Sequence, residues 1–143
     1  MTAPVKFYDF VNQLGLAKHD LSGHVFKIML TNNVPNLTDT LKSNITDIAA
    51  GNGYVAGGTS TVNSWASALG VGTWTGTMVV FTAAGGSIGP FRYAVLYNDT
   101  QASPVKPLVC YWDNGSTVTL NSGDQFRVKF SGSTTTGTMG TLT

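Results

Sequence analysis

The segment Phe91-Arg92-Tyr93-Ala94-Val95-Leu96-Tyr97 decides the fold, because it predicts a strand that is buried on both of its faces. Side chains alternate between the two faces of a strand, so one face carries four large side chains, those of Phe91, Tyr93, Val95 and Tyr97. The opposite face is also apolar, because it carries Ala94 and Leu96. Such a strand is expected at the centre of a sheet that is covered on each side.

On the C-terminal side of this segment, strand and turn signals alternate. Residues 108–113 are mostly apolar, and Asn114-Gly115 fits a two-residue hairpin turn because both residues tolerate positive φ. A strand through Val118 and Leu120 is expected next, followed by a turn at 121–124. Residues 125–130 then alternate cleanly, with Phe126, Val128 and Phe130 facing inward.

On the N-terminal side, three more strands are expected, at 24–31, 59–65 and 73–83. Many strands of this length separated by turn signals are typical of an antiparallel sandwich or barrel. The abundance of Thr, with no Glu in the chain, also favours strands over helices. We therefore predict a mainly β fold, an antiparallel β-sandwich of jelly-roll-like form, as a single domain over residues 1–143.

Two helices are expected outside the strands. The N-terminal helical segment, 1–21, places Phe7, Phe10, Val11 and Leu14 at helical spacing; Pro4 suits the opening turn and Gly15 suits the end. A shorter helix is expected over residues 39–48, with Asp39 as its N-cap. Residues 131–143 are expected to form either a last short strand or an extended arm.

Composition excludes several classes of protein. Of the 143 residues only 10% are charged, and the net charge of +1 is too small and too scattered for a nucleic-acid-binding surface. A hydrophobic content of 42% argues against disorder. No apolar run approaches the length of a membrane span, and the N-terminus lacks the apolar core of a secretory signal. We expect no nucleic acid and no membrane as partners, and synthesis in a cytoplasm.

One motif suggests a hydrolase. Gly85-Gly86-Ser87-Ile88-Gly89 fits the G-x-S-x-G pattern, in which a serine sits on a strained turn between a strand and a helix. Here the strand at 91–97 follows the motif instead of a helix, and both histidines precede the serine. We therefore expect Ser87 to lie in a turn between two strands, with no catalytic role.

Other candidate sites are equally weak. Residues 51–56, G-N-G-Y-V-A, match a dinucleotide pattern, but Gly57-Gly58 would cut short the helix that this site needs. His19 and His24 are too few for a zinc site and are expected in an exposed polar loop. Cys110 is expected to be a small buried hydrophobic residue. The prediction is therefore no enzyme, with no catalytic, cofactor-binding or metal-binding residues.

The aromatic residues allow two interpretations. They could pack in the core, as most of them lie in apolar strand patterns, or they could line a face that binds sugars. The set comprises Trp65, Trp74, Trp112, Tyr54, Tyr93, Tyr97 and Tyr111.

Four separated motifs resemble a family of virion structural proteins from tailed bacteriophages and prophages. They are a Y-V-A-G-G turn at 54–58, the P-F-R-Y-A-V-L-Y-N-D-T strand at 90–100, the hairpin pattern from Pro107-Leu108 to 112–115, and the F-R-V-K-F strand at 126–130. The resemblance covers residues 24–143 in order. Val55 departs from it, since Thr is commoner there, and the ending after Ser131 is richer in Thr and Gly than usual.

The resemblance implies a role without chemistry. It implies a capsid decoration or cement protein on the virion exterior that binds the major capsid protein and stabilises the head, and a homo-oligomer, with a trimer favoured. The segments 1–21 and 131–143 are expected to be the arms that reach neighbours. The alternative is a tail, baseplate or fibre-associated subunit whose exposed aromatic side chains contact host glycans.

Overall fold

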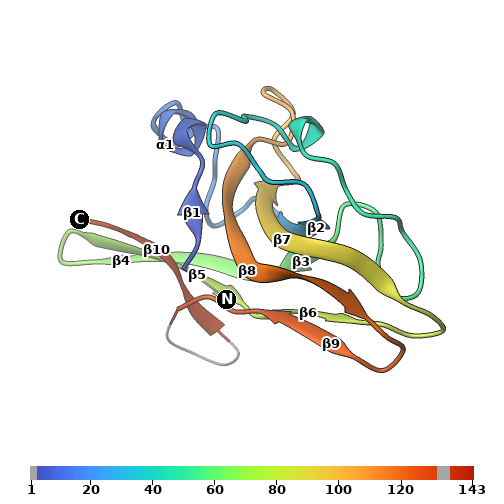
Figure 1. Cartoon of the computed structure of the whole chain (residues 1–143). Helices are drawn as coiled ribbons and strands as arrows, with labels where there is room; N and C mark the ends of the chain where they lie inside the picture. The colour runs from blue at the N-terminus through green and yellow to red at the C-terminus, as the bar shows by residue number, and fades with distance from the viewer. Residues whose placement is uncertain (1–2, 132–135) are drawn as a thin grey trace.

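The computed structural model describes residues 3–131 and 136–143, and within them the fold is mainly β with antiparallel sheets (Figure 1). The largest sheet has the order β1-β8-β7-β2-β3. Its strands are β1 (Val5–Lys6), β8 (Leu108–Leu120), β7 (Ile88–Asn98), β2 (Phe26–Thr31) and β3 (Thr59–Thr61). A three-stranded sheet has the order β10-β5-β4, formed by β10 (Thr136–Leu142), β5 (Val71–Thr77) and β4 (Asn63–Ala68). A two-stranded sheet joins β6 (Val79–Thr82) to β9 (Gln125–Val128).

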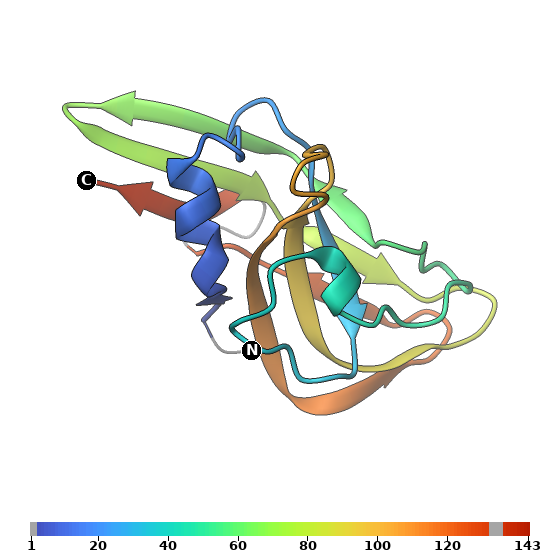
Figure 2. The same ribbon diagram turned by 90° about the horizontal axis from the view of Figure 1, so that it is seen from above.

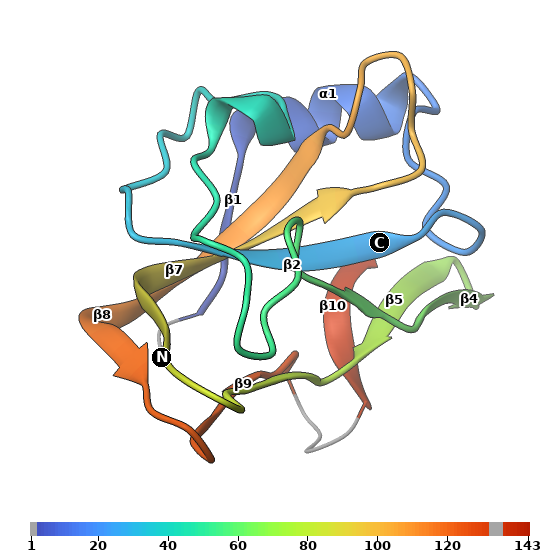
Figure 3. The ribbon, with the colours of Figure 1, turned by 90° about the vertical axis from the view of Figure 1, so that its right-hand side faces the viewer.

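The strand β7 lies at the centre of the five-stranded sheet, as its sequence predicts. It pairs with β2 on one side and with β8 on the other. Its two faces contribute to two different clusters, with Ala94 and Leu96 in one and Val95 and Tyr97 in the other. Both faces of the sheet are therefore covered (Figure 3).

The main core fills the space between the five-stranded sheet and the two smaller sheets, which makes the fold sandwich-like. Side chains from β2, β7 and β8 meet side chains from β5, β6 and β9 there. The largest contributors are Phe26, Trp74, Phe81, Phe91 and Trp112. The second cluster lies on the far face of the sheet, where Phe7 and Ile45 cover Met29 and Leu108.

The predicted N-terminal helix is present as α1 (Tyr8–Gly15), with Phe10 as its buried contact. Pro4 does not open it, because the chain first forms the short strand β1, which pairs with β8. Residues 136–142 of the predicted C-terminal segment form a strand, because β10 pairs with β5 on both sides of an irregularity at Met139; residues 132–135 of that segment lie outside the described residues. In the described part of the chain, none of the helices has the length and hydropathy that a membrane crossing requires.

The predicted helix over residues 39–48 is wrong. Only a 3-10 turn, η1 (Lys42–Asn44), forms there. Asp39 does not cap a helix, because its carboxylate accepts a hydrogen bond from the Asn36 backbone N–H. Leu41 is extended and forms a β-bridge with Pro107, so a contact distant in sequence overrides the local helical pattern.

The predicted hairpin turn at Asn114-Gly115 is also wrong, because β8 continues through it. Asp113 is opposite Tyr93 and Val118 is opposite Phe91, so residues 114–117 form a bulge opposite Arg92. The Arg92 guanidinium donates to both oxygens of Asp113, at 2.8 and 3.0 Å. Both halves of β8 thus pair with β7 instead of pairing with each other.

Two predicted strands are each divided between sheets. Residues 59–65 become β3 and β4, with the break at Val62, and 73–83 become β5 and β6, with the break at Met78. The breaks are adjacent in space, since the Thr77 N–H donates to the Val62 carbonyl oxygen at 3.0 Å. At these two breaks the chain leaves one sheet and enters another, from β3 to β4 and from β5 to β6. Beyond them the β4–β5 hairpin extends away from the body (Figure 1).

Candidate functional site

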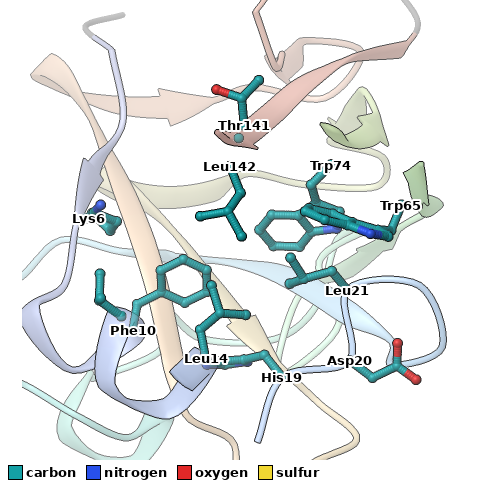
Figure 4. Close-up of a pocket in the computed structure, with 12 residues that line it drawn as sticks. Lys6, Phe10, Leu14, His19, Asp20, Leu21, Trp65, Trp74, Thr141 and Leu142 are labelled. Carbon is teal, nitrogen blue, oxygen red and sulfur yellow. The ribbon is translucent and has the colours of Figure 1, made fainter. Parts of the chain in front are cut away.

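An apolar groove lies between α1, the loop that follows it, the β4–β5 hairpin and the end of β10 (Figure 4). Its volume is about 570 Å³. The helix and its loop contribute Phe10, Leu14, His19 and Leu21, whereas the strands contribute the side chains on the opposite wall. That wall consists of Trp65, Trp74 and Leu142 together with Gly140 and Thr141.

The indole wall of the groove follows from the sequence V-G-T-W-T-G-T of β5. Trp74 pairs directly with Trp65 of β4, and the two indoles lie side by side (Figure 4). A Cβ at Gly72 would collide with the Trp65 ring, so the glycine allows this ring to lie flat over β5. Gly76 likewise leaves room for Met139 and Phe130. Trp74 is 3% exposed, whereas Trp65 is half-buried.

His19 is buried at the base of the groove, and the prediction that it lies in an exposed loop is wrong. Its Nδ1 accepts a hydrogen bond from Nδ2 of Asn98, at 3.1 Å. The same amide nitrogen lies 2.8 Å from Nδ1 of His24. Asn98 Oδ1 accepts from the backbone N–H groups of Thr100 and Gln101, which leaves its NH₂ group to serve both histidines.

This network fixes the tautomer of His19. Because Nδ1 is an acceptor, the proton of the neutral ring lies on Nε2. Burial, assisted by the nearby His24, lowers the pKa of His19 to about 4, so the ring is neutral at pH 7. Among the described residues, the buried Nε2 has no hydrogen-bond partner, and neither does Nε1 of Trp74. Two side chains that line the apolar groove therefore carry N–H groups that lack acceptors, and both of these atoms are covered by protein.

The Asp20 carboxylate at the rim is already occupied. Its Oδ1 accepts hydrogen bonds from the backbone N–H groups of Ser22 and Gly23 and from the Ser22 hydroxyl. The hydrogen bonds from Gly23 and Ser22 lower the pKa of Asp20. Asp20 thus shapes the loop that carries His19. The lining of the groove is mostly apolar, which suits it to binding an apolar group.

The other sequence candidates lie away from this groove. Ser87 lies between the strands β6 and β7, as predicted, and its side chain is exposed. Residues 51–56 form a loop closed by a bridge between Gly51 and Tyr54, as predicted. Within residues 3–131 and 136–143, no three His, Cys, Asp or Glu side chains gather as metal ligands would.

Cys110 and the aromatic residues mostly serve packing. Cys110 is partly buried against the main core, and burial raises the pKa of its thiol. Five of the seven aromatic candidates are buried: Trp74, Trp112, Tyr54, Tyr93 and Tyr97. Trp65 and Tyr111 are half-buried, and Trp65 lines the groove together with Trp74. A sugar-binding face made of all seven is therefore excluded, and the Trp65–Trp74 wall is what remains of that interpretation.

Sequence reasoning did not find the groove, because its lining comes from segments around residues 6–21, 65, 74 and 140–142. The alternation of Gly with Trp in β5 is the local signal that could have indicated it. Comparison of the chain with protein-family models, with curated proteins and with solved structures found no match.

Proposed function

We propose that the chain is a non-enzymatic structural subunit of a tailed-bacteriophage virion that decorates the capsid exterior and binds the major capsid protein. The sequence motifs described above support this assignment, because several of them occur in the order typical of that family. Binding would stabilise the head by adding buried surface between neighbouring capsid subunits. The trimer that the resemblance implies stays a prediction about the number of copies at each site on the head.

The observation that carries the proposal is the uncharged three-stranded sheet. From Ile48 to Phe91 the chain has no Asp, Glu, Lys, Arg or His, and β10 has none either. Because buried charges lose their hydration, a surface without charges can be covered by a partner at a low desolvation cost. The β4–β5 hairpin of this sheet projects from the body, where it can reach a neighbour (Figure 2).

The tip of this hairpin has a side chain suited to insertion into a pocket. Leu69 is fully exposed at the tip, with a relative exposure of 104%. Leu69 and Gly70 both have positive φ, 52° and 79°, as a two-residue hairpin turn of type I′ requires. Leucine is unfavourable in this conformation, whereas asparagine tolerates it. An exposed leucine at a position that disfavours it indicates a contact outside the chain.

A single substitution tests this role. Leu69→Asn should leave the fold intact, and should raise the free energy of unfolding by about 1 kcal/mol through relief of backbone strain. Heads that lack the protein should bind the variant more weakly than the unaltered chain, measured by co-sedimentation with purified heads. The matched control is Val55→Thr, which alters another exposed apolar side chain in a loop outside the hairpin.

Two outcomes would count against the proposal. If fractionated virions contain the protein in tails and not in heads, the decoration role is wrong. If Leu69→Asn binds heads as well as Val55→Thr does, the hairpin tip is not the contact.

The second candidate function is a tail, baseplate or fibre-associated subunit that contacts host glycans. The half-buried Trp65 beside Trp74 favours it, because sugar rings stack on indole faces and Trp65 is the more exposed of the two indoles. Titration with host oligosaccharides, followed by tryptophan fluorescence, tests this function separately from head binding.

A further inference from the structure

The outer edge of β4 is a free sheet edge. In the order β10-β5-β4, the strand β4 is last, and no other strand of the described residues pairs with it. Figure 2 shows β4 on the outer side of the projecting hairpin, with the loop between α1 and β2 crossing near its first residues. One end is anchored, since the Asn63 side chain donates to the Leu21 carbonyl oxygen at 2.8 Å.

The register of the hairpin determines which backbone groups face outward. The two-residue turn Leu69-Gly70 closes on the pair Ala68–Val71, and a turn of this type closes on a hydrogen-bonded pair. Hydrogen-bonded and non-hydrogen-bonded pairs alternate along antiparallel strands, so residues 66 and 64 also bond to β5. The backbone N–H and C=O groups of Asn63, Trp65 and Ser67 therefore point to the free edge.

This edge lacks the devices that keep sheet edges apart. Soluble proteins protect their edge strands with charged side chains, proline or β-bulges. The sequence of β4, N-S-W-A-S-A, has no charge and no proline, and its pairing with β5 runs without a register shift. The other two strands of the sheet are uncharged as well.

We propose that β4 pairs antiparallel with β4 of a second copy of this chain, about a two-fold axis at Trp65. The three outward residues are spaced symmetrically about Trp65, so Asn63 would face Ser67 of the other copy and the two Trp65 residues would face each other. All three then find partners at once, which gives about six backbone hydrogen bonds and a continuous six-stranded sheet. The two indoles lie side by side on the groove face of that sheet.

The lack of charge favours a second copy over another partner. A two-fold axis at Trp65 brings the side chains of residues 64–66 close to the same side chains of the other copy, so a charge at one of these positions would lie near its own sign. β4 has no charged residue, so no such repulsion arises between two copies. The inference does not depend on the proposed virion role, since it rests on the free edge alone.

The mass of the full chain in solution, measured by light scattering during size-exclusion chromatography, tests the proposal. We expect a concentration-dependent species with twice the 15.0 kDa of one chain. Ser67→Pro removes an outward N–H that β5 does not use, so it should weaken dimerisation by more than about tenfold while the circular dichroism spectrum stays unchanged.

Two variants that place opposite charges at Ala66 test the dimer independently, in case the proline disturbs the hairpin. Ala66→Asp and Ala66→Lys should each dimerise more weakly alone, because the two equal charges become diagonal neighbours across the axis, and an equimolar mixture should recover the dimer. The control places the same charges at Thr119, an exposed position on β8 in the other sheet. These control variants should dimerise as the unaltered chain does.

Three results would overturn the proposal. They are a monomer at concentrations up to about 1 mM, a trimer of unaltered stability in all β4 variants, and a dimer that neither Ser67→Pro nor the Ala66 charges affect. None of these results bears on head binding, so failure here is distinguishable from failure of the virion role.

Discussion

At the scale of single residues, Asn98 organises the region behind the groove. It is completely buried, and its one amide group bonds to two histidines and two backbone N–H groups. A buried amide of this kind stabilises the fold only while all of its partners are satisfied. The loop that bears His19, the end of β7 and the turn after it therefore depend on one side chain.

Asn98→Ala should lower the free energy of unfolding by about 3 kcal/mol, because it leaves several buried polar groups without partners. Urea denaturation followed by circular dichroism measures this change. Thr117→Ala is the control: its hydroxyl lies 3.5 Å from Asn32 at the surface, and its removal should change stability by less than about 0.5 kcal/mol. Equal effects of the two substitutions would contradict the role given to Asn98.

The lowered pKa of His19 predicts a pH dependence of stability. Burial and His24 bring this pKa from 6.5 to about 4 in the folded chain. Between these values the unfolded chain takes up a proton that the folded chain does not, so stability falls as the pH falls from 6.5 to 4. The loss should amount to roughly 3 kcal/mol, and urea denaturation at a series of pH values measures it.

His19→Phe should remove this part of the pH dependence, because phenylalanine does not titrate and fits the aromatic surroundings of Phe10 and Phe26. The pKa values of Asp99 and Asp113 are lowered in the folded chain, by ion pairs with lysines and with Arg92 respectively. The stability that these two carboxylates contribute is lost at lower pH than the range from 6.5 to 4 in which His19 acts. An unchanged slope between pH 6.5 and 4 in the variant would show that another group causes it.

At the scale of elements, the bulge in β8 shows how a correct local signal can lead to a wrong topology. Gly115 does have a positive φ, 89°, and its N–H donates to Asp113 Oδ1 at 2.8 Å. The signal specifies a bend in the chain but not the partner of the strands around it. The partner is β7, whose 11 residues are long enough to pair with both halves of β8.

Gly115→Ala should lower the free energy of unfolding by about 1 kcal/mol, because Gly115 has a φ of 89° that alanine rarely adopts. No neighbouring atom would meet the added methyl group, so the effect isolates the backbone conformation. Gly15→Ala is the matched control, with open space and no positive φ. Thermal denaturation should show a lower melting temperature for Gly115→Ala only; a shared decrease would contradict the explanation.

The elements that the sequence could predict are those in which one periodic pattern covers the whole segment. The strands β2, β7 and β9 are of this kind, and so is α1. The segment 39–48 has a helical spacing of apolar residues, but the bridge of Leu41 to Pro107 makes it extended. That contact joins positions far apart in the chain, so no local pattern could predict it.

At the scale of the whole molecule, the groove could not be predicted, because four separate segments build it. The burial of His19 depends on Asn98, which is 79 residues away along the chain. The uncharged character of the three-stranded sheet, in contrast, can be read directly from the sequence between Ile48 and Phe91. What the fold adds is that this stretch and β10 come together in one projecting sheet.

The pairing of β10 with β5 has a consequence for the order of events during synthesis. The ribosome delivers β4 and β5 well before β10, so the emerging hairpin must wait for its third strand while much of the intervening chain is made. Until then both edges of the hairpin are open, and nascent chains on one messenger are close neighbours. A late-arriving strand thus sets a time window in which premature association between nascent chains competes with completion of the sheet.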